Sequence, residues 1–253
     1  MAPTTVRPIN NHLNALVNNL DNTCIKIMPD ELNYNLRKCK NFEKFFHVFH
    51  HNIRSFHDNY DQLSALLDEH FPKIDVLALS ETWFNHSSCS VLDGYTGYHT
   101  FRVSSRGGGI SVYISKNYRS TKNCTLSGIY TTFETCIVDV FVTNDLNIKL
   151  IGVYRPPRSS ATEFNLEFGE FISNNFSSNS KCLIVGDFNI DIGVGGIHRT
   201  DLCNMFESIS YNPLILILTI LNNIIDHIWT NINFTFLSHV LENDITDHFN
   251  TIA

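Results

Sequence analysis

Four apolar runs of this chain are followed, within three residues or fewer, by an acidic side chain. The four segments are Leu79-Ser80-Glu81-Thr82-Trp83, Val185-Gly186-Asp187-Phe188-Asn189, Ile225-Asp226-His227 and Ile245-Thr246-Asp247-His248. Runs rich in leucine and β-branched residues predict buried strands, and α/β folds build their sites where strands end. One such acid is best explained by a turn or a cap. Four in one chain favour a fold that gathers strand ends at one sheet edge.

The spacing of the other apolar residues predicts a mixed α/β architecture. Strand-like runs at residues 45–53 and 74–79 flank a segment with helical spacing at residues 60–70. Two amphipathic helices are predicted, one over Thr162–Phe176 with a Thr N-cap and one over Thr200–Ile209. Further strands are predicted at residues 109–114, 135–142, 148–154, 182–185 and 224–229. We therefore expect a large mixed sheet system covered by helices.

The chain divides into two parts by composition. Its 253 residues suffice for one sizeable α/β domain or two small ones. Residues 1–43 are rich in Asn and other polar residues and contain several prolines, so we interpret them as a polar, flexible leader. The apolar pattern begins near residue 44, and we assign residues 44–253 to one domain.

Composition excludes several classes of protein. Apolar residues make up 43% of the chain and charged residues 17%, which excludes disorder over most of its length. The net charge of −7 excludes a protein that coats nucleic acid through bulk positive charge, so any nucleic-acid contact must be local. The seven cysteines are scattered and never form a C-x-x-C pair, which argues against a zinc ribbon or disulfide scaffold and favours a reducing, intracellular setting.

Membrane insertion is not expected. The first thirty residues lack the continuous apolar run of a signal peptide. The longest apolar stretch, Pro213–Ile225, is interrupted by Thr219, Asn222 and Asn223. It is also shorter than the roughly 20 residues that a spanning helix requires.

The residue types at the predicted strand ends suit a hard cation. Carboxylates joined by an Asn and a His offer oxygen ligands, and Mg²⁺ takes one or two carboxylates together with waters and phosphate oxygens. A zinc site would require cysteines or several histidines at short spacing, which these segments do not offer. After Arg199 the chain has six acidic residues and no Lys or Arg, a pattern that a solvated acidic face also explains.

Seven short motifs occur in an order that carries a family resemblance. They are His51-Asn52-Ile53-Arg54-Ser55, Ser80-Glu81-Thr82-Trp83, Arg106-Gly107-Gly108-Gly109-Ile110, Val153-Tyr154-Arg155-Pro156-Pro157, Gly186-Asp187-Phe188-Asn189, Ile225-Asp226-His227-Ile228-Trp229 and Thr246-Asp247-His248. Over residues 44–250 the chain resembles the endonuclease/exonuclease/phosphatase superfamily, and most of all the endonuclease domain of non-LTR (LINE-type) retrotransposon polymerase proteins. The resemblance implies a deoxyribonuclease I-like four-layer α/β sandwich, with two mixed sheets face to face and helices outside.

The resemblance also implies metal-assisted phosphodiester hydrolysis. It makes Glu81 the principal Mg²⁺ carboxylate, with Asn52 beside it as a ligand or water holder and Asp247 near the metal. Mn²⁺ is the expected substitute ion. Asp187 would orient or deprotonate the attacking water, and Asn189 would hydrogen-bond the phosphate. This chemistry is sensible because an anionic phosphodiester must have its charge neutralised while a water is activated.

The remaining implied roles have structural alternatives. Tyr154 would donate its hydroxyl to the scissile phosphate, although it is also explained as a packed strand end. His248, oriented by Asp226, would stabilise charge on the phosphorane; a surface histidine is the alternative. Local DNA contacts are expected from arginines that flank the motifs, namely Arg54, Arg106 and Arg155, although the main role of Arg106 is expected to be in a glycine turn.

The function expected from the resemblance is a Mg²⁺-dependent endonuclease that nicks DNA, acts in the nucleus and needs no obligate protein partner. One alternative is a phosphatase or lipid phosphodiesterase of the same superfamily, and another is a catalytically decayed fragment. Two departures motivate the latter: Leu214–Ile224 is mostly Leu and Ile where relatives carry Ser and Thr, and Thr246 stands where Ser is usual. The chain ends soon after His248, so we expect no reverse transcriptase to follow.

Overall fold

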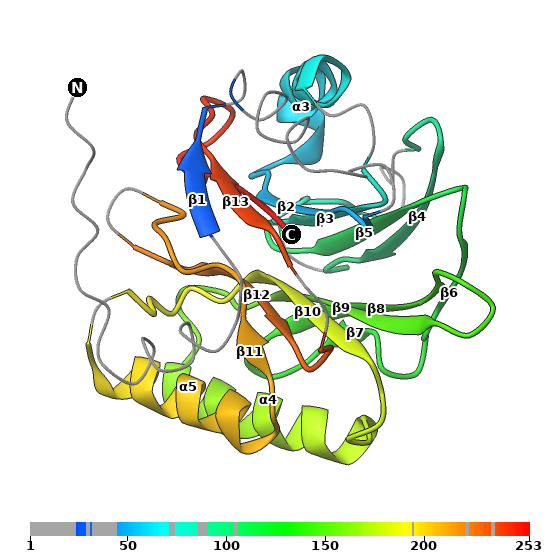
Figure 1. Cartoon of the computed structure of the whole chain (residues 1–253). Helices are drawn as coiled ribbons and strands as arrows, with labels where there is room; N and C mark the ends of the chain where they lie inside the picture. The colour runs from blue at the N-terminus through cyan, green and yellow to red at the C-terminus, as the bar shows by residue number, and fades with distance from the viewer. Residues whose placement is uncertain are drawn as a thin grey trace.

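The computed structural model describes residues 24–28, 31, 45–70, 74–85, 91–103, 106–193, 195–220, 223–233 and 236–253. Within these residues two seven-stranded sheets pack face to face and helices lie outside them (Figure 1). α3 (Phe56–His70) covers the first sheet, while α4 (Ala161–Asn175) and α5 (Ile197–Ser208) lie side by side against the second. The expected four-layer sandwich is confirmed.

The first sheet mixes parallel and antiparallel neighbours. Its central strands β2 (Val48–Asn52) and β3 (Val76–Ser80) are parallel, as a strand-helix-strand unit requires. The strands follow the order β1 (Cys24–Ile27), β13 (Ser238–Leu241), β14 (Asn250–Ile252), β2, β3, β5 (Ile110–Ser115) and β4 (Tyr95–Thr100). The first sheet therefore joins both ends of the described chain to its middle.

The second sheet is built around β9 (Asn147–Tyr154) and β10 (Cys182–Asp187), which run parallel. β12 (Asp226–Thr230) and β8 (Glu134–Phe141) flank them antiparallel. The outer strands are β11 (Asn212–Pro213), β6 (Arg119–Lys122) and β7 (Gly128–Ile129). The helix α4 between β9 and β10 makes the crossover that parallel strands need.

The core follows the two-residue period of buried strands. In β3, Val76 and Ala78 pack in the cluster between the two sheets, while Leu77 and Leu79 pack in the cluster under α3. α4 buries a stripe of aromatic side chains that includes Phe164 and Phe168. Because both faces of the central strands are covered, these strands read as continuous apolar runs in the sequence.

The predicted helices are present, with one correction at an N-terminus. α4 is capped by Ser160, whose hydroxyl accepts a hydrogen bond from the Glu163 amide, so the assignment of Thr162 as the cap is wrong. The apolar residues that follow β11 pack in the core, since Leu214 and Ile215 are buried. None of the helices among the described residues is both long and apolar enough to cross a membrane.

β1 falls inside the segment that was predicted to be a leader. Its residues pair in parallel with β13, and Ile27 is buried. Apart from Met28 and Glu31, the remaining residues of the predicted leader lie outside the described part of the chain. The division at residue 43 therefore stays a prediction.

Candidate active site

Four polar side chains form a row across the second sheet. Cross-strand registers place Glu134 opposite Tyr154, Tyr154 opposite Asp187, and Asp187 opposite Asp226. Residues that are paired across neighbouring strands point to the same face. All four are at most 4% exposed. The second sheet therefore brings together residues that are far apart in the sequence.

The first sheet adds Asn52 and Glu81 to this row. Asn52 is the last residue of β2, and Glu81 follows the last residue of β3. The side-chain amide of Asn52 donates to Glu81 Oε1 at 2.9 Å and to Asp187 Oδ2 at 2.8 Å. One amide thus bridges a carboxylate of each sheet, and the sandwich closes over the site.

The loops that carry these residues adopt an uncommon backbone. Glu81, Trp83 and Asn189 have φ values of 54°, 55° and 49°. Non-glycine residues in this region require support from their surroundings and cluster at functional sites. Backbone hydrogen bonds hold the Glu81 loop: the amide of Trp83 donates to the carbonyl of Gly108, and the amide of Ser55 donates to the carbonyl of Glu81.

Glycine is required immediately before Asp187. Gly186 has a φ of 156°, and a Cβ at this position would collide with the carbonyl oxygen of Val153. The neighbouring strand can approach β10 closely only because Gly186 has no side chain. Beyond the strand, the backbone amide of Asn189 donates to Asp187 Oδ1 at 2.9 Å and its side-chain amide donates to Asp187 Oδ2 at 3.1 Å. The Gly-Asp-Phe-Asn motif therefore forms a compact loop around the carboxylate.

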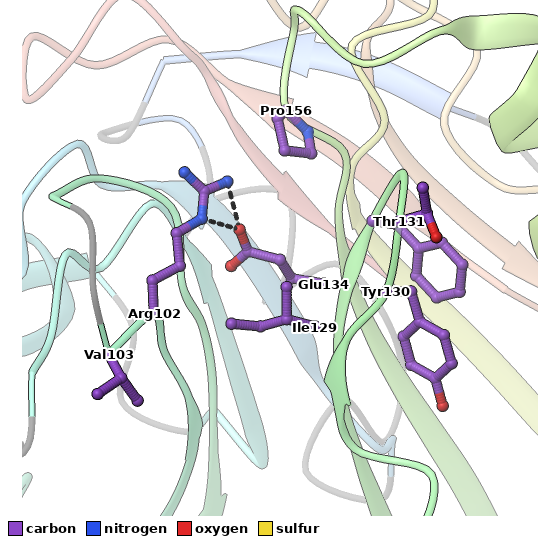
Figure 2. A pocket seen from close by; sticks show the side chains of 8 residues that line it. Arg102, Val103, Ile129, Tyr130, Thr131, Glu134 and Pro156 are labelled. Atoms are coloured by element: carbon purple, nitrogen blue, oxygen red, sulfur yellow. Dashed lines mark hydrogen bonds and ion pairs between the residues drawn. The ribbon is translucent and has the colours of Figure 1, made fainter.

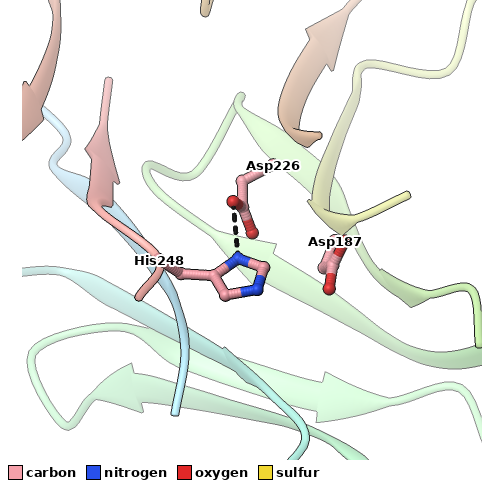
Figure 3. Close-up of side chains that lie close together, drawn as sticks. All are labelled: Asp187, Asp226 and His248. Carbon is pink, nitrogen blue, oxygen red and sulfur yellow. Dashed lines mark hydrogen bonds and ion pairs between the residues drawn. The ribbon is translucent and has the colours of Figure 1, made fainter. Parts of the chain in front are cut away.

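Asp226 and His248 form a buried pair (Figure 3). Asp226 Oδ2 lies 2.9 Å from His248 Nδ1, and the side chains are 0% and 3% exposed. Thr219 supports Asp226, because its hydroxyl accepts hydrogen bonds from the amides of Ile225 and Asp226, both at 3.1 Å. Leu214, Ile215 and Ile224 of the apolar segment before Asp226 are buried, and Asp226 remains paired with His248.

Thr246 fixes the loop that carries His248. Its hydroxyl donates to the carbonyl of Asn52 at 3.0 Å and accepts from the amide of His248 at 3.2 Å. A hydroxyl is what these contacts require, so threonine replaces the usual serine without loss of the hydrogen bonds. This loop therefore ties His248 directly to β2.

Burial and pairing push the two aspartates in opposite directions. Burial, together with the nearby Asp226, raises the pKa of Asp187 to about 7. Burial also opposes ionisation of Asp226, but the ion pair with His248 outweighs it and lowers the pKa of Asp226. For His248, burial opposes the cation, yet Asp226 and then Asp187 raise its pKa to about 9. Two carboxyl groups with diverging pKa values are a known route to different acid and base roles.

The donor set fits a divalent metal. Ligand atoms of Asp187, Asp226 and His248 lie within 4.8 Å of one another. Asp226 Oδ1 is buried and, among the described residues, receives no hydrogen bond; His50 Nδ1 lies 3.8 Å from it. Glu81 Oε1, bonded to the same Asn52 amide as Asp187, adds a partly exposed carboxylate. Carboxylate oxygens are the ligands that Mg²⁺ and Mn²⁺ prefer, so the site can hold such an ion.

Of the arginines and the aspartate predicted to lie around the site, three are exposed and one is buried. Asp247 forms an ion pair with Arg54 at 2.7 Å, and their side chains are 43% and 44% exposed. Arg106 is exposed and stacks over Trp83 at 5.4 Å. Arg155 is only 4% exposed and donates to the carbonyls of Phe188, Asn189 and Ser159. Its donors hold the loop after β10, so Arg155 has a structural role here, and the expectation that it contacts DNA stays a prediction.

Sequence reasoning missed several residues around the site. Glu134 comes before an apolar run, whereas the acids singled out from the sequence follow apolar runs, so the same pattern does not identify it. Its signal is its position opposite Tyr154, which only the strand pairing reveals. Thr219 and His50 were also missed. His50 Nε2 shares a hydrogen bond of 2.9 Å with the Ser80 hydroxyl, with a direction that depends on the tautomer, and His50 Nδ1 lies 3.8 Å from Asp226 Oδ1.

A family profile described as "Endonuclease/Exonuclease/phosphatase family" matches residues 32–248. This chain belongs to the endonuclease/exonuclease/phosphatase family. No curated protein sequence matches it significantly. The family fold is that of metal-using phosphodiester and phosphate-ester hydrolases, and the buried Asp187, Asp226 and His248 group agrees with a hydrolase of this type.

Solved structures of the family share the fold at low sequence identity. The endonuclease domain of TRAS1, a telomere-specific non-LTR retrotransposon, aligns with a TM-score of 0.66 at 11% identity over 82% of this chain and 96% of its own. The 3′ phosphatase NExo from Neisseria, bound to a product DNA hairpin, gives 0.60 at 14% over 82% and 98%. The AP endonuclease LMAP from Leishmania major gives 0.60 at 13% over 95% and 97%. These likenesses establish the fold alone.

Proposed function

We propose that this protein is a Mg²⁺-dependent endonuclease that nicks DNA, of the kind found in non-LTR retrotransposons. The observation that carries the proposal is the bridge of Asn52 between Glu81 and Asp187, beside the Asp226–His248 pair. These residues are the ones that the retrotransposon-like motifs contribute. Nicking by such an enzyme leaves a 3′-hydroxyl that can prime DNA synthesis.

Glu81 is the proposed metal carboxylate. It is the least buried of the site acids described above, apart from Asp247, and its other oxygen accepts from Trp83 Nε1 at 3.3 Å. Asn52 holds this carboxylate and Asp187 at a fixed separation. Glu81 would hold the Mg²⁺, which when bound would supply charge neutralisation at the phosphate. Asp247, which precedes His248, pairs with Arg54, so we assign it a secondary part in metal binding.

Asp187 is the proposed base that orients and deprotonates the attacking water. Asn52 and Asn189 fix both of its oxygens. The raised pKa of Asp187 lies near neutral pH. Its carboxylate therefore binds a proton more strongly than an ordinary aspartate does, yet part of it remains ionised and can act as a general base. The side-chain amide of Asn189 donates to Asp187 and to the carbonyl of Arg155, so its proposed contact with a phosphate oxygen would replace one of these hydrogen bonds.

His248 and Tyr154 are the proposed stabilisers of charge on the phosphate. The Asp226 pair keeps His248 protonated at neutral pH, so His248 serves as a cation for the phosphate and the carboxylates are left as the metal ligands. Burial raises the pKa of Tyr154, and Glu81 and Asp187 raise it further. The phenol therefore stays protonated and can donate a hydrogen bond. Exposed Arg106 and Arg54, the latter in an ion pair with Asp247, are the proposed local DNA contacts despite the net charge of −7.

The test is conversion of supercoiled plasmid to the nicked circle with Mg²⁺, with EDTA as the metal-free control. We expect nicking with Mg²⁺ or Mn²⁺ and none with EDTA, and extension of the nick by a DNA polymerase without prior phosphatase treatment. A 3′-phosphorylated oligonucleotide, a phosphoinositide and p-nitrophenyl phosphate are tested in parallel. Faster hydrolysis of one of these than of plasmid would replace the endonuclease proposal with a phosphatase, and absence of all activity would support a decayed enzyme.

A further inference from the structure

A pocket of 310 Å³ lies at the edge of the site, between the end of β4 and the β7–β8 turn (Figure 2). Its lining includes the Arg102–Glu134 ion pair and the apolar side chains of Val103, Ile129 and Pro156. Val103 is 73% exposed and Ile129 is 51% exposed. The pocket thus combines a cation with uncovered apolar surface, and none of the roles assigned above uses it.

Glu134 connects this pocket to the proposed catalytic residues. It is the cross-strand partner of Tyr154, and Pro156 follows Tyr154 by two residues. Glu134 Oε2 accepts a hydrogen bond from the amide of Gly109 at 2.6 Å. The carbonyl of Gly109 in turn accepts from the amide of Thr82 at 3.4 Å, next to Glu81. A ligand in the pocket would therefore lie beside the position proposed for the scissile phosphate.

Arg102 is held in a defined orientation. Its Nε and Nη2 both contact Glu134 Oε1, at 2.6 Å and 2.5 Å. The Glu134 side chain is 1% exposed while that of Arg102 is 26% exposed, so the carboxylate is enclosed and part of the arginine side chain reaches solvent. A guanidinium has five N–H donors, and two contacts leave donors for a second anion.

The glycine turn is shaped around this ion pair. Gly108 has a φ of 69°, and a Cβ there would lie 2.6 Å from Glu134 Oε1 and 2.8 Å from Arg102 Cζ. No larger residue fits without displacing the pair. The Arg-Gly-Gly-Gly motif therefore leaves room for Arg102 and Glu134 in addition to forming a turn.

We propose that this pocket binds the nucleotide next to the scissile phosphate, with Arg102 contacting the phosphate and the Val103 and Ile129 side chains packing on the sugar or base. The proposal rests on the proposed function, because in a polynucleotide the next phosphate lies one nucleotide away from the scissile one. Glu134 acts as a positioning residue for Arg102. The pocket would thus favour a nucleic-acid strand over a small phosphate ester.

The experiment uses the full chain and a fluorescein-labelled DNA oligonucleotide, with binding followed by anisotropy at several KCl concentrations without added metal. The double variant Arg102→Gln/Glu134→Gln replaces the ion pair by a neutral hydrogen-bonded pair, so that no buried charge is left alone. Ile129→Asp places a negative charge on the rim and removes no side-chain hydrogen bond. Lys26→Gln, on β1 at the opposite edge of the first sheet, and Leu166→Asp, exposed on α4, are the matched controls.

We expect Kd to rise about tenfold in each pocket variant and the salt slope of binding to fall by about one in the double variant. The KM for plasmid should rise by a similar factor while kcat changes less, and both controls should bind like the parent. Unchanged Kd and salt slope in both pocket variants would overturn this site even if the parent nicks DNA. Pocket-dependent binding without any nicking would instead reject the proposed function and leave the site in place.

Discussion

The proposed site has two halves that the chain builds differently. Tyr154, Asp187 and Asp226 stand in one row of the second sheet, where strand ladders set their register and bury them. Glu81 and Asn189 lie on loops with positive φ, where hydrogen bonds hold the backbone. The sheet half therefore controls protonation through burial, and the loop half controls the placement of ligands.

Removing one acid from each half should separate these two contributions. Asp187→Ala and Glu81→Ala should each slow plasmid nicking by about a thousandfold, the range expected for loss of a general base or a metal ligand. Excess Mg²⁺ should partly restore Glu81→Ala, because its defect is in metal affinity, and should not restore Asp187→Ala. Thermal melts must match the parent. Nicking at near-parent rate by either variant would remove the assigned role.

The histidines on strands and the histidine on the loop should change the free energy of unfolding in opposite directions as the pH varies. Burial lowers the pKa of His50 and His227 to about 4 and that of His51 to about 3. Below the unfolded value of about 6.5 the unfolded chain binds protons that the folded chain excludes, so each histidine costs about 1.4 kcal/mol per pH unit of acidification. Asp187, with its raised pKa, opposes this by one proton between its unfolded value of about 3.8 and pH 7.

His248 acts in the alkaline range. Its contribution is fully present below about pH 6.5 and is lost as the pH rises through about 9. From these pKa changes we expect urea unfolding in EDTA to give the largest free energy of unfolding at roughly pH 6 to 7. His248→Gln should flatten the alkaline side alone. A profile that stays level from pH 4 to 9 would contradict the buried, neutral state of the three histidines.

A buried and an exposed arginine of the site should contribute differently to the free energy of unfolding. Arg155→Gln should lower the free energy of unfolding by about 2 to 4 kcal/mol, because it removes charge-assisted hydrogen bonds to buried carbonyls. Arg106→Gln should change it by less than about 0.5 kcal/mol, since Arg106 is exposed. Urea titrations of both variants measure the difference. Equal effects would show that Arg155 is not the support of the Asp187 loop.

Thr219 should give a smaller effect than Arg155. Thr219→Val removes the acceptor for the amides of Ile225 and Asp226, which should cost about 1 to 3 kcal/mol and loosen the Asp226–His248 pair. Nicking should fall roughly tenfold, as for a positioning residue of a catalytic group. Thr125→Val, on an exposed turn, is the control and should behave like the parent. A parent-like melting temperature and rate would show that water replaces the hydroxyl.

Sequence patterns predicted the strands that carry the site because those strands are buried on both faces. β3, β9 and β10 are continuous apolar runs, and each ends in or beside a polar site residue. The predicted convergence of Asn52 with Glu81 and Asp187 follows from two sheets whose strand ends meet at one edge.

The missed features depend on partners that are distant in the chain. β13 and β14 are short and contain polar residues, and pairing with neighbours makes them strands. Arg155 stands beside a matched motif, but its burial depends on carbonyls 33 and 34 residues away. Glu134 is an acid at the start of a strand, where a cap or solvent contact is the ordinary expectation. No local pattern distinguishes such roles.

The place of β14 has a consequence for synthesis of the chain. It lies between β13 and β2, with Ile252 paired to Phe49 and Thr251 paired to His50. A nascent chain in which residues 250–252 are still inside the ribosome leaves this side of β2 unpaired. An unpaired strand edge can add strands from other molecules. We therefore expect a partly synthesised chain to be open to misassembly at this edge of β2 until residues 250–252 have emerged.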